Sequence, residues 1–243
     1  MPGESRLKNI ALLDFFEQTN YNYKKDLDKL KTICYYTKTR AGIPVELEDF
    51  SMSYGMEQPF LIKAIAESLN CENFFEIGTG RGTACYSAAL SKNMKQITTI
   101  DIIPFKHKRN EFIGCKPKMV SNRDLYMMIP YREKEKINFF ERRDLPGIIK
   151  DGEKKFDMCF IDGNHDSPSI IFEDFLLSKR LLKDDGAIVF DDYFPNKFVV
   201  KKIVDRILEA DKSLVPTFIN FRGHLFPNRI SETESGAVLL KRA

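Results

Sequence analysis

The sequence predicts an α/β protein built on a mostly parallel sheet, and three observations carry this prediction. Short apolar runs alternate with helix-like segments along most of the chain, an order that places helices on both faces of a parallel sheet. The run from Asn73 to Ile77 breaks into glycines at Gly78, Gly80 and Gly82, as in a tight strand-to-helix turn. The clearly predicted strands each end in or close to an acidic residue.

The glycine turn leads into a helix, because residues 83–90 are small, apolar and rich in helix formers. Glycine allows positive φ and lets a ligand approach the backbone. A dinucleotide fingerprint needs G-x-G-x-x-G, but Gly82 comes one residue early and Thr83 takes the place of the third glycine. Glu76, two residues before Gly78, would repel a pyrophosphate and suits a ligand that carries a cationic amino-acid group.

The N-terminal part carries no chemical motif. Residues 5–40 have apolar positions at helical spacing, and the stretch that follows contains glycine and proline and is expected to be a loop. We therefore expect an N-terminal helical cap over residues 1–55 and a main domain over residues 56–243. An amphipathic helix over 57–69 opens the main domain.

Strands and helices then alternate. Segment 102–136 is too long for a simple crossover and contains three prolines, so we expect an insertion over the site. The predicted strands are 73–77, 96–100, 137–140, 156–161 and 187–190, with weaker strands at 215–221 and 236–241, and the predicted helices are 83–90, 169–182 and 197–210.

Composition limits the class of protein. The chain has 243 residues, 43% of them apolar, which is enough for a sizeable core, and a net charge of +3 that is nearly neutral for this size. Nothing resembles the basic stripe of a nucleic-acid binder, and the longest basic patch, Lys106 to Arg109, is expected to be a solvated loop. We expect no nucleic-acid partner.

The cysteines and the chain start indicate a soluble, cytoplasmic protein. Five cysteines without C-x-x-C spacing are expected to be reduced and to form neither a zinc site nor a disulfide framework. The first residues lack the apolar core of a signal peptide, and no apolar run approaches the roughly 20 residues of a membrane span. We expect no membrane partner.

Acidic residues stand at or just after successive strand ends: Asp101, Asp144, Asp162, and Asp191 with Asp192. In an open α/β sheet the ligand crevice lies outside these carboxyl ends. Converging like charges need a cation to offset them, so we expect bound cationic groups. Asp101 is placed to accept hydrogen bonds from ribose hydroxyls, and the alternative is an exposed strand-end acid.

The pattern E-x-G-x-G-x-G resembles motif I of the class I S-adenosylmethionine (SAM) methyltransferases. The resemblance implies SAM as cofactor, a Rossmann-like fold with a seven-stranded sheet, and an antiparallel edge hairpin made by the two weaker strands. It also places Asp144 near the adenine amino group, although Arg143 is equally placed to pair with it. The cofactor-binding residues that it implies are Glu76, Gly78, Thr79, Gly80, Gly82, Asp101 and Asp144.

Asp162, Asp191 and Asp192 form a second group, and compact oxygen ligands suit Mg²⁺. The segments Ile161-Asp162-Gly163-Asn164-His165 and Phe190-Asp191-Asp192-Tyr193 are similar to those of the metal-dependent small-molecule O-methyltransferases. The similarity includes the catechol and caffeoyl-coenzyme A enzymes and is closer to the macrolide- and cephalosporin-type branch. Asp192 departs from the catechol-type pattern, which has asparagine there.

His165 lies three residues after Asp162, where the catechol-type family has a catalytic lysine. A histidine whose pKa is near neutrality can take a proton from a substrate hydroxyl, particularly beside a metal ion. The alternative is a loop histidine that bonds a neighbouring carboxylate. Asp166 is placed either to orient the ring or to cap the following helix.

We therefore expect a SAM- and Mg²⁺-dependent O-methyltransferase that acts on a hydroxyl of a small sugar- or natural-product-like molecule. The first alternative is a non-catalytic binding or scaffold protein with this fold. The second is a methyltransferase of another acceptor class, although the loop at residues 162–165 lacks the N/D-P-P-Y/F motif of enzymes that methylate exocyclic amino groups. The glycine spacing argues against an NAD-dependent enzyme. A homodimer through the apolar faces of the N-terminal helices is one possible assembly.

Overall fold

The computed structural model describes residues 7–53, 55–149, 154–193, 199–221, 225–226 and 236–243. Its main sheet has eight strands in the order β1-β9-β10-β8-β7-β2-β3-β6, and β4 and β5 form a separate hairpin. The strands are β1 (Lys8–Ala11), β2 (Asn73–Ile77), β3 (Gln96–Asp101), β4 (Arg109–Ile113), β5 (Lys116–Val120), β6 (Ile137–Glu141), β7 (Phe156–Ile161), β8 (Leu182–Phe190), β9 (Leu214–Asn220) and β10 (Gly236–Arg242). The α-helices are α1 (Leu12–Gln18), α2 (Leu27–Thr37), α3 (Gln58–Ser68), α4 (Thr83–Ala89), α5 (Asn122–Met128), α6 (Leu145–Ile148), α7 (Pro168–Leu181) and α8 (Val200–Ala210).

The predicted α/β class is confirmed. All seven predicted strands are present, and β9 and β10 form the expected antiparallel hairpin at one side of the sheet. The prediction of continuous helical structure over residues 5–40 is wrong at its start, because Lys8–Ala11 is a strand that pairs in parallel with β9. The sheet therefore has eight strands rather than seven.

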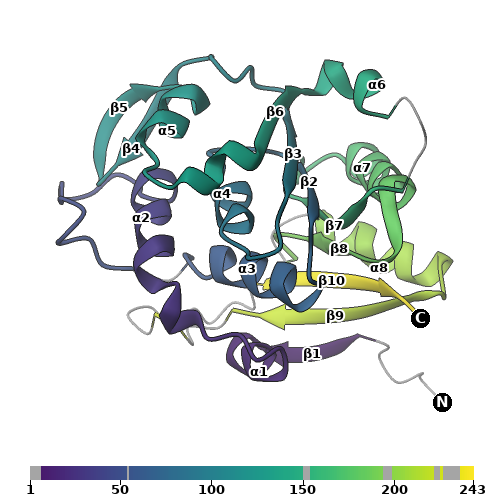
Figure 1. Cartoon of the computed structure of the whole chain (residues 1–243). Helices are drawn as coiled ribbons and strands as arrows, with labels where there is room; N and C mark the ends of the chain where they lie inside the picture. The colour runs from purple at the N-terminus through teal and green to yellow at the C-terminus, as the bar shows by residue number, and fades with distance from the viewer. Residues whose placement is uncertain (1–6, 54, 150–153, 194–198, 222–224, 227–235) are drawn as a thin grey trace.

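Helices cover both faces of the sheet (Figure 1), and each face has its own core. Side chains of one strand alternate between the two cores, since successive residues of a strand point to opposite faces. In β7, Phe160 packs in the core formed with α1–α4, whereas Cys159 and Ile161 pack in the core formed with α7 and α8. The central strands are thus buried on both sides, which explains their near-continuous apolar sequence.

The strand order creates the crevice for a ligand. The chain begins the central part of the sheet at β2, moves outward through β3 and β6, and then returns to β7 on the other side of β2. The order reverses between β2 and β7, where open α/β sheets bind ligands. Backbone hydrogen bonds align the carboxyl ends there: Gly78 N donates to Ile100 O over 2.9 Å, and Asp162 N donates to Ile77 O over 2.9 Å.

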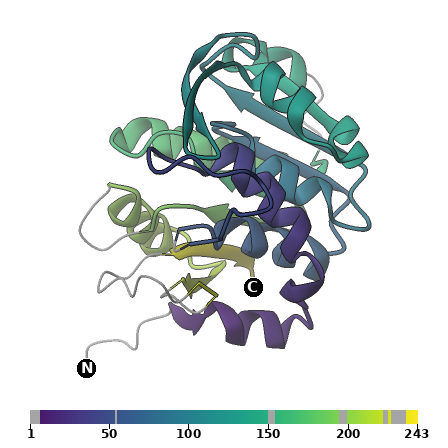
Figure 2. The ribbon, with the colours of Figure 1, turned by 90° about the vertical axis from the view of Figure 1, so that its left-hand side faces the viewer.

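Segment 102–136 forms the β4–β5 hairpin and α5, and Figures 1 and 2 show both beside α2. The hairpin joins the end of α2 and the following loop through backbone hydrogen bonds. Gly114 N donates to Tyr35 O over 3.4 Å, and Val45 N donates to Gly114 O over 3.0 Å. The N-terminal region and the insertion are therefore in direct contact.

The sheet core can be tested at Phe160, whose side chain is fully buried. We expect Phe160→Ala to lower the free energy of unfolding by about 3–5 kcal/mol, because the substitution removes buried apolar surface and leaves a cavity. Phe172→Ala is the matched control, since Phe172 is 45% exposed on α7, and it should change stability by about 0.5 kcal/mol or less. Urea unfolding of both variants checks this, and equal losses would contradict the assignment of the core.

Candidate active site

The glycine turn lies against the β7 loop. Gly78 has φ of +93°, and a Cβ atom there would lie 2.1 Å from the backbone oxygen of Asp162, so only glycine fits. Gly80 has φ of +53°, and a Cβ atom there would meet no other atom within 4 Å. The turn is thus closed towards Asp162 and open at Gly80, where a ligand has room to approach the backbone.

Glu76 lies beneath the turn and is 1% exposed. The Thr99 hydroxyl donates to its Oε2, and the Thr79 and Thr99 hydroxyls lie 2.6 Å apart. Burial raises the pKa of Glu76 to about 8. The carboxyl group is therefore tied to the turn through two threonines, and an ionised Glu76 would gain from a cation nearby.

Asp101 also contacts the turn. Its Oδ2 accepts a hydrogen bond from Gly80 N over 2.8 Å, and its Oδ1 accepts one from Ile103 N over 2.9 Å. The neighbouring Ile102 is 79% exposed, which is unusual for so large an apolar side chain and which the sequence analysis did not single out. The edge of the glycine turn at Gly80 is thus bordered by the polar side chain of Asp101 and followed in the chain by the exposed apolar side chain of Ile102.

Asp144 is exposed and stands apart from the other acids. Its Oδ2 accepts a hydrogen bond from Glu141 N over 2.9 Å. The alternative pairing of Arg143 with Asp144 is not what the structure has, because Arg143 Nη2 lies 2.8 Å from Glu141 Oε2. Asp144 instead borders a hollow of about 790 Å³ along β2, β3 and β6, which is also lined by Thr98 and Phe140.

Two of the three predicted metal ligands, Asp162 and Asp192, lie beside the predicted catalytic residue His165. Donor atoms of Asp162, His165 and Asp192 all lie within 4.8 Å of one another, a group that does not include Asp191. Asp191 joins them through Gln58, whose side-chain amide donates to Asp191 Oδ2 and lies 3.4 Å from Asp162 Oδ2. Carboxylate oxygens with an imidazole nitrogen fit a divalent cation chemically.

The raised pKa values of Asp162 and Asp191 also favour a bound cation. Burial and the neighbouring Asp191 raise the pKa of Asp162 well above its usual value. Burial and the neighbouring Asp192 raise the pKa of Asp191 to about 6. A bound cation would offset both effects, because an opposite charge favours the ionised form of each carboxyl group.

His165 lies between two of these acids. Its Nδ1 is 3.3 Å from Asp192 Oδ2, and its Nε2 is 3.9 Å from Asp162 Oδ1. Asp166 is exposed, and its backbone N–H donates to Asn164 Oδ1 over 3.0 Å. Asp192, whose Oδ2 lies beside His165 Nδ1, is placed to orient the ring.

The sequence analysis missed three residues that shape this site. Gln58, at the start of α3, reaches both acid-bearing loops. Lys38, just after α2, lies close enough for its charge to lower the pKa of both Asp162 and Asp191. Arg81 extends from the turn to backbone carbonyls of residues 36 and 39. Gln58 and Lys38 belong to no motif. Arg81 lies inside the glycine turn, but only the fold shows which carbonyls its side chain reaches.

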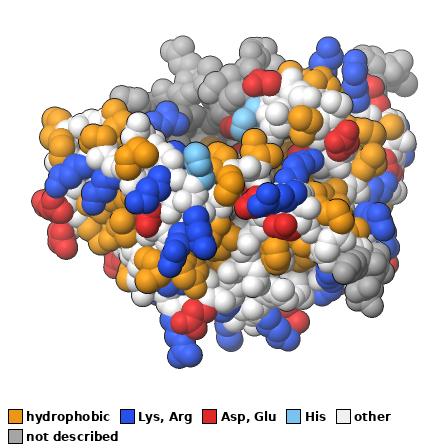
Figure 3. All heavy atoms as spheres, turned by 90° about the horizontal axis from the view of Figure 1, so that it is seen from above, with side chains coloured by type: hydrophobic (Ala, Val, Ile, Leu, Met, Phe, Trp, Pro, Cys, Tyr) orange, Lys and Arg blue, Asp and Glu red, His pale blue; other side chains and the backbone are white. Residues whose placement is uncertain are grey.

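One face of the molecule is mixed in charge. On the face seen in Figure 3, lysine and arginine side chains are interspersed with acidic and apolar ones. None of the helices in the described part of the chain is long and apolar enough to cross a membrane.

An open α/β sheet with a glycine turn and converging acids at its carboxyl edge is the arrangement of a Rossmann-like, ligand-binding α/β fold. Residues 75–193 match a family model described as a methyltransferase domain. No curated protein matches the sequence. The comparison with solved structures identifies the same fold over nearly the whole chain.

Three solved structures illustrate the likeness. A putative O-methyltransferase from Klebsiella pneumoniae has a TM-score of 0.57 at 16% identity, over 95% of this chain and 98% of that one. TomG from Streptomyces achromogenes is an O-methyltransferase involved in tomaymycin synthesis and was solved with SAM. It has a TM-score of 0.56 at 17% identity, over 96% of this chain and 99% of that one. An O-methyltransferase from Bacillus cereus, solved with S-adenosylhomocysteine (SAH), has a TM-score of 0.55 at 15% identity, over 96% of this chain and 100% of that one.

The match over residues 75–193 agrees with the methyltransferase class predicted from the glycine turn, and the solved structures show the same fold.

Glu76 offers a test through the pH dependence of stability. Its pKa is about 8 in the folded protein, against 4.5 for an unperturbed glutamate, so between these values the folded protein holds a proton that the unfolded chain has released. The wild type should therefore lose stability as pH rises through this window. Glu76→Gln removes this loss, and its unfolding free energy relative to wild type should increase by about 1–4 kcal/mol between about pH 5 and pH 8.5.

Urea unfolding of the ligand-free proteins at the two pH values measures the effect. A difference between Glu76→Gln and wild type that is the same at both pH values would show that Glu76 does not titrate in this window.

Proposed function

We propose that this protein is a Mg²⁺-dependent O-methyltransferase that moves the methyl group of SAM to a hydroxyl of a small sugar- or natural-product-like molecule. The observation that carries the proposal is the grouping of Asp162, His165 and Asp192 within 4.8 Å, on the loops beside the glycine turn. A proton acceptor and oxygen ligands for a cation thus stand next to the place where the cofactor would bind.

In this proposal the turn residues Gly78, Thr79, Gly80 and Gly82 hold the methionine part of the cofactor. Asp101 would accept hydrogen bonds from the ribose, and the exposed Ile102 would cover an adenine face. Glu76 would act from below, through Thr99 and Thr79, and would offset the positive charge of the cofactor. Asp144 remains the candidate for the adenine amino group, at the outer end of the same edge.

Asp162, Asp191 and Asp192 would hold the divalent ion, which supplies Lewis-acid stabilisation of a deprotonated hydroxyl. His165 would accept the proton of that hydroxyl, with Asp192 holding its Nδ1 side. Much of the rate would come from the alignment of acceptor oxygen and cofactor methyl group. Residues 1–55 and 102–136 would shape the acceptor pocket, because both regions border the turn.

The three similar structures are of one O-methyltransferase described as putative and two further O-methyltransferases, which supports the proposed type of acceptor atom, and one of those proteins is involved in tomaymycin synthesis. No described feature favours a nucleic-acid acceptor or a non-catalytic role. These alternatives are therefore not carried further.

The first test is titration calorimetry with S-adenosylhomocysteine, with MgCl₂ and again with EDTA. We expect micromolar binding in both, because the turn residues lie outside the acid group. Binding that requires Mg²⁺ would assign the ion to the cofactor pocket instead. Absence of binding in both would refute the proposed cofactor site.

Asp191→Ala separates cofactor binding from chemistry. We expect it to abolish Mg²⁺-stimulated methyl transfer, measured as S-adenosylhomocysteine release with a panel of hydroxylated acceptors, while S-adenosylhomocysteine affinity stays within about threefold. Asp184→Ala is the control, because Asp184 is exposed and bonds Lys154 and Arg242 away from the crevice. Undiminished activity in Asp191→Ala would remove the metal from the proposal.

His165→Gln tests the proton acceptor. We expect kcat to fall by about 10²–10⁴-fold, the usual contribution of a general base, with KM for SAM unchanged. Mn²⁺ affinity, measured by electron paramagnetic resonance, should also stay unchanged. A loss of Mn²⁺ affinity in this variant would make His165 a metal ligand rather than the base.

A further inference from the structure

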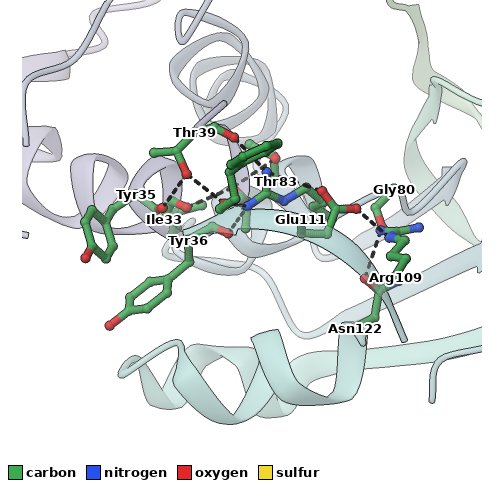
Figure 4. Close-up of polar contacts among 12 residues, drawn as sticks. Ile33, Tyr35, Tyr36, Thr39, Gly80, Thr83, Arg109, Glu111 and Asn122 are labelled. Carbon is green, nitrogen blue, oxygen red and sulfur yellow. Dashed lines mark hydrogen bonds and ion pairs between the residues drawn. The ribbon is translucent and has the colours of Figure 1, made fainter. Parts of the chain in front are cut away.

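Two arginines hold the glycine turn from its outer side, and the proposed mechanism uses neither. Arg81 lies within the turn, and its side chain is 14% exposed. Its Nη1 donates to Thr39 O over 2.9 Å, and its Nη2 donates to Tyr36 O over 2.5 Å and also to Phe112 O. Figure 4 shows two of these residues, Tyr36 and Thr39, near Thr83 of the helix that follows the turn. One guanidinium thus joins the turn to two distant segments.

The α2 contacts have a physical basis. Tyr36 lies in the last turn of α2 and Thr39 follows that helix, so their carbonyls have no partner within it. A guanidinium there also complements the negative end of the helix dipole. Thr83 adds a second link, since its hydroxyl donates to Thr37 Oγ1 over 3.0 Å. Arg81 and Thr83 therefore supply hydrogen-bond partners for the carboxyl end of α2.

The hairpin is tied to the turn by charge. Arg109 of β4 donates through Nη2 to Gly80 O, and its Nε lies 2.6 Å from Glu111 Oε1. Glu111 Oε2 lies 3.6 Å from Arg81 Nη1. Arg81, Glu111 and Arg109 form one bridge between two neighbouring residues of the turn and the hairpin (Figure 4).

The same connections reach the acid group. Lys38 stands between Thr37 and Thr39, and its charge acts on both Asp162 and Asp191. A movement of the end of α2 would therefore move a cation relative to the acids. From here on, the cap means the unit made of α2, residues 38–47 and the β4–β5 hairpin, and not the whole of residues 1–55.

We propose that Arg81 is a positioning residue that couples occupancy of the cofactor turn to the placement of the cap. The proposal rests on the proposed binding of SAM at the turn. A ligand that fixes Gly80 and Thr83 also fixes the guanidinium between them, and with it the carbonyls of Tyr36, Thr39 and Phe112. Coupling between sites is reciprocal, so cofactor binding organises the cap before the acceptor enters, and a displaced cap weakens cofactor binding.

Hydrogen exchange of the full chain with and without S-adenosylhomocysteine tests the coupling. The reporters are the amides of Val45 and Gly114, whose hydrogen bonds join the hairpin to α2 and its loop and do not touch the turn. We expect the ligand to slow their exchange about tenfold in the wild type, a typical coupling between sites. In Arg81→Met the ligand should bind more weakly, and at saturation the slowing at both reporters should be lost.

Glu111→Gln is the second variant, because it keeps the side-chain shape and every carbonyl contact of Arg81 while removing the negative charge between the two arginines. This variant should lose part of the ligand-induced slowing at the two reporters. Arg132→Met is the matched control, since Arg132 lies in the same insertion, is 90% exposed and pairs with Glu135. It should behave like the wild type.

Three results would overturn the inference. Equal protection of both reporters in wild type, Arg81→Met and Glu111→Gln would show that the turn and the cap are independent. Failure of wild type to bind S-adenosylhomocysteine would remove the proposed cofactor site and the coupling together. Normal binding without protection of the reporters would remove the coupling alone.

Discussion

The grouping of partly and fully buried carboxyl groups at one edge of the sheet is the constraint on which the rest of this structure depends. Glu76, Asp162 and Asp191 all have raised pKa values, and desolvation is the largest cause for each. The Thr99 hydroxyl at Glu76, and the Gln58 amide and Lys38 charge at the aspartates, offset this only in part. A cationic cofactor and a divalent ion would supply the remaining positive charge. The ligand-free fold thus carries an electrostatic cost that the proposed function would relieve.

The strand register brings these carboxyl groups to the same edge of the sheet. Because Ile77 pairs with both Ile100 and Ile161, the loops that follow β2, β3 and β7 leave the sheet at one level. The close approach of Gly78 to the Asp162 backbone then joins the cofactor turn to the acid group. A shift of one residue would break this contact and turn every core side chain of the strand to the other face. The apolar cores on both faces prevent such a shift.

The regions without recognisable motifs contribute through contacts of long sequence separation. The β1 strand was missed because its four residues, Lys8–Ala11, include two polar ones and form no apolar run, and its partner β9 lies about two hundred residues away. The β4–β5 hairpin was missed because its strands are mostly polar, β4 is largely half-buried, and β5 is largely exposed and contains Pro117. The long central strands were predictable, since burial on both faces makes them continuous apolar runs.

The sequence by itself determined the sheet, the glycine turn and the acids at its carboxyl edge, because each depends on neighbouring residues and a local pattern. It also indicated the methyltransferase class, since that motif lies within one short stretch around Glu76 and Gly80. Only the tertiary structure decided that Gln58 and Lys38 act on the acids of the crevice, that Arg81 joins the turn to α2, and that Asp144 borders the hollow along β2, β3 and β6. These relations depend on packing between helices, hairpin and sheet, and such packing has no signature in the local sequence.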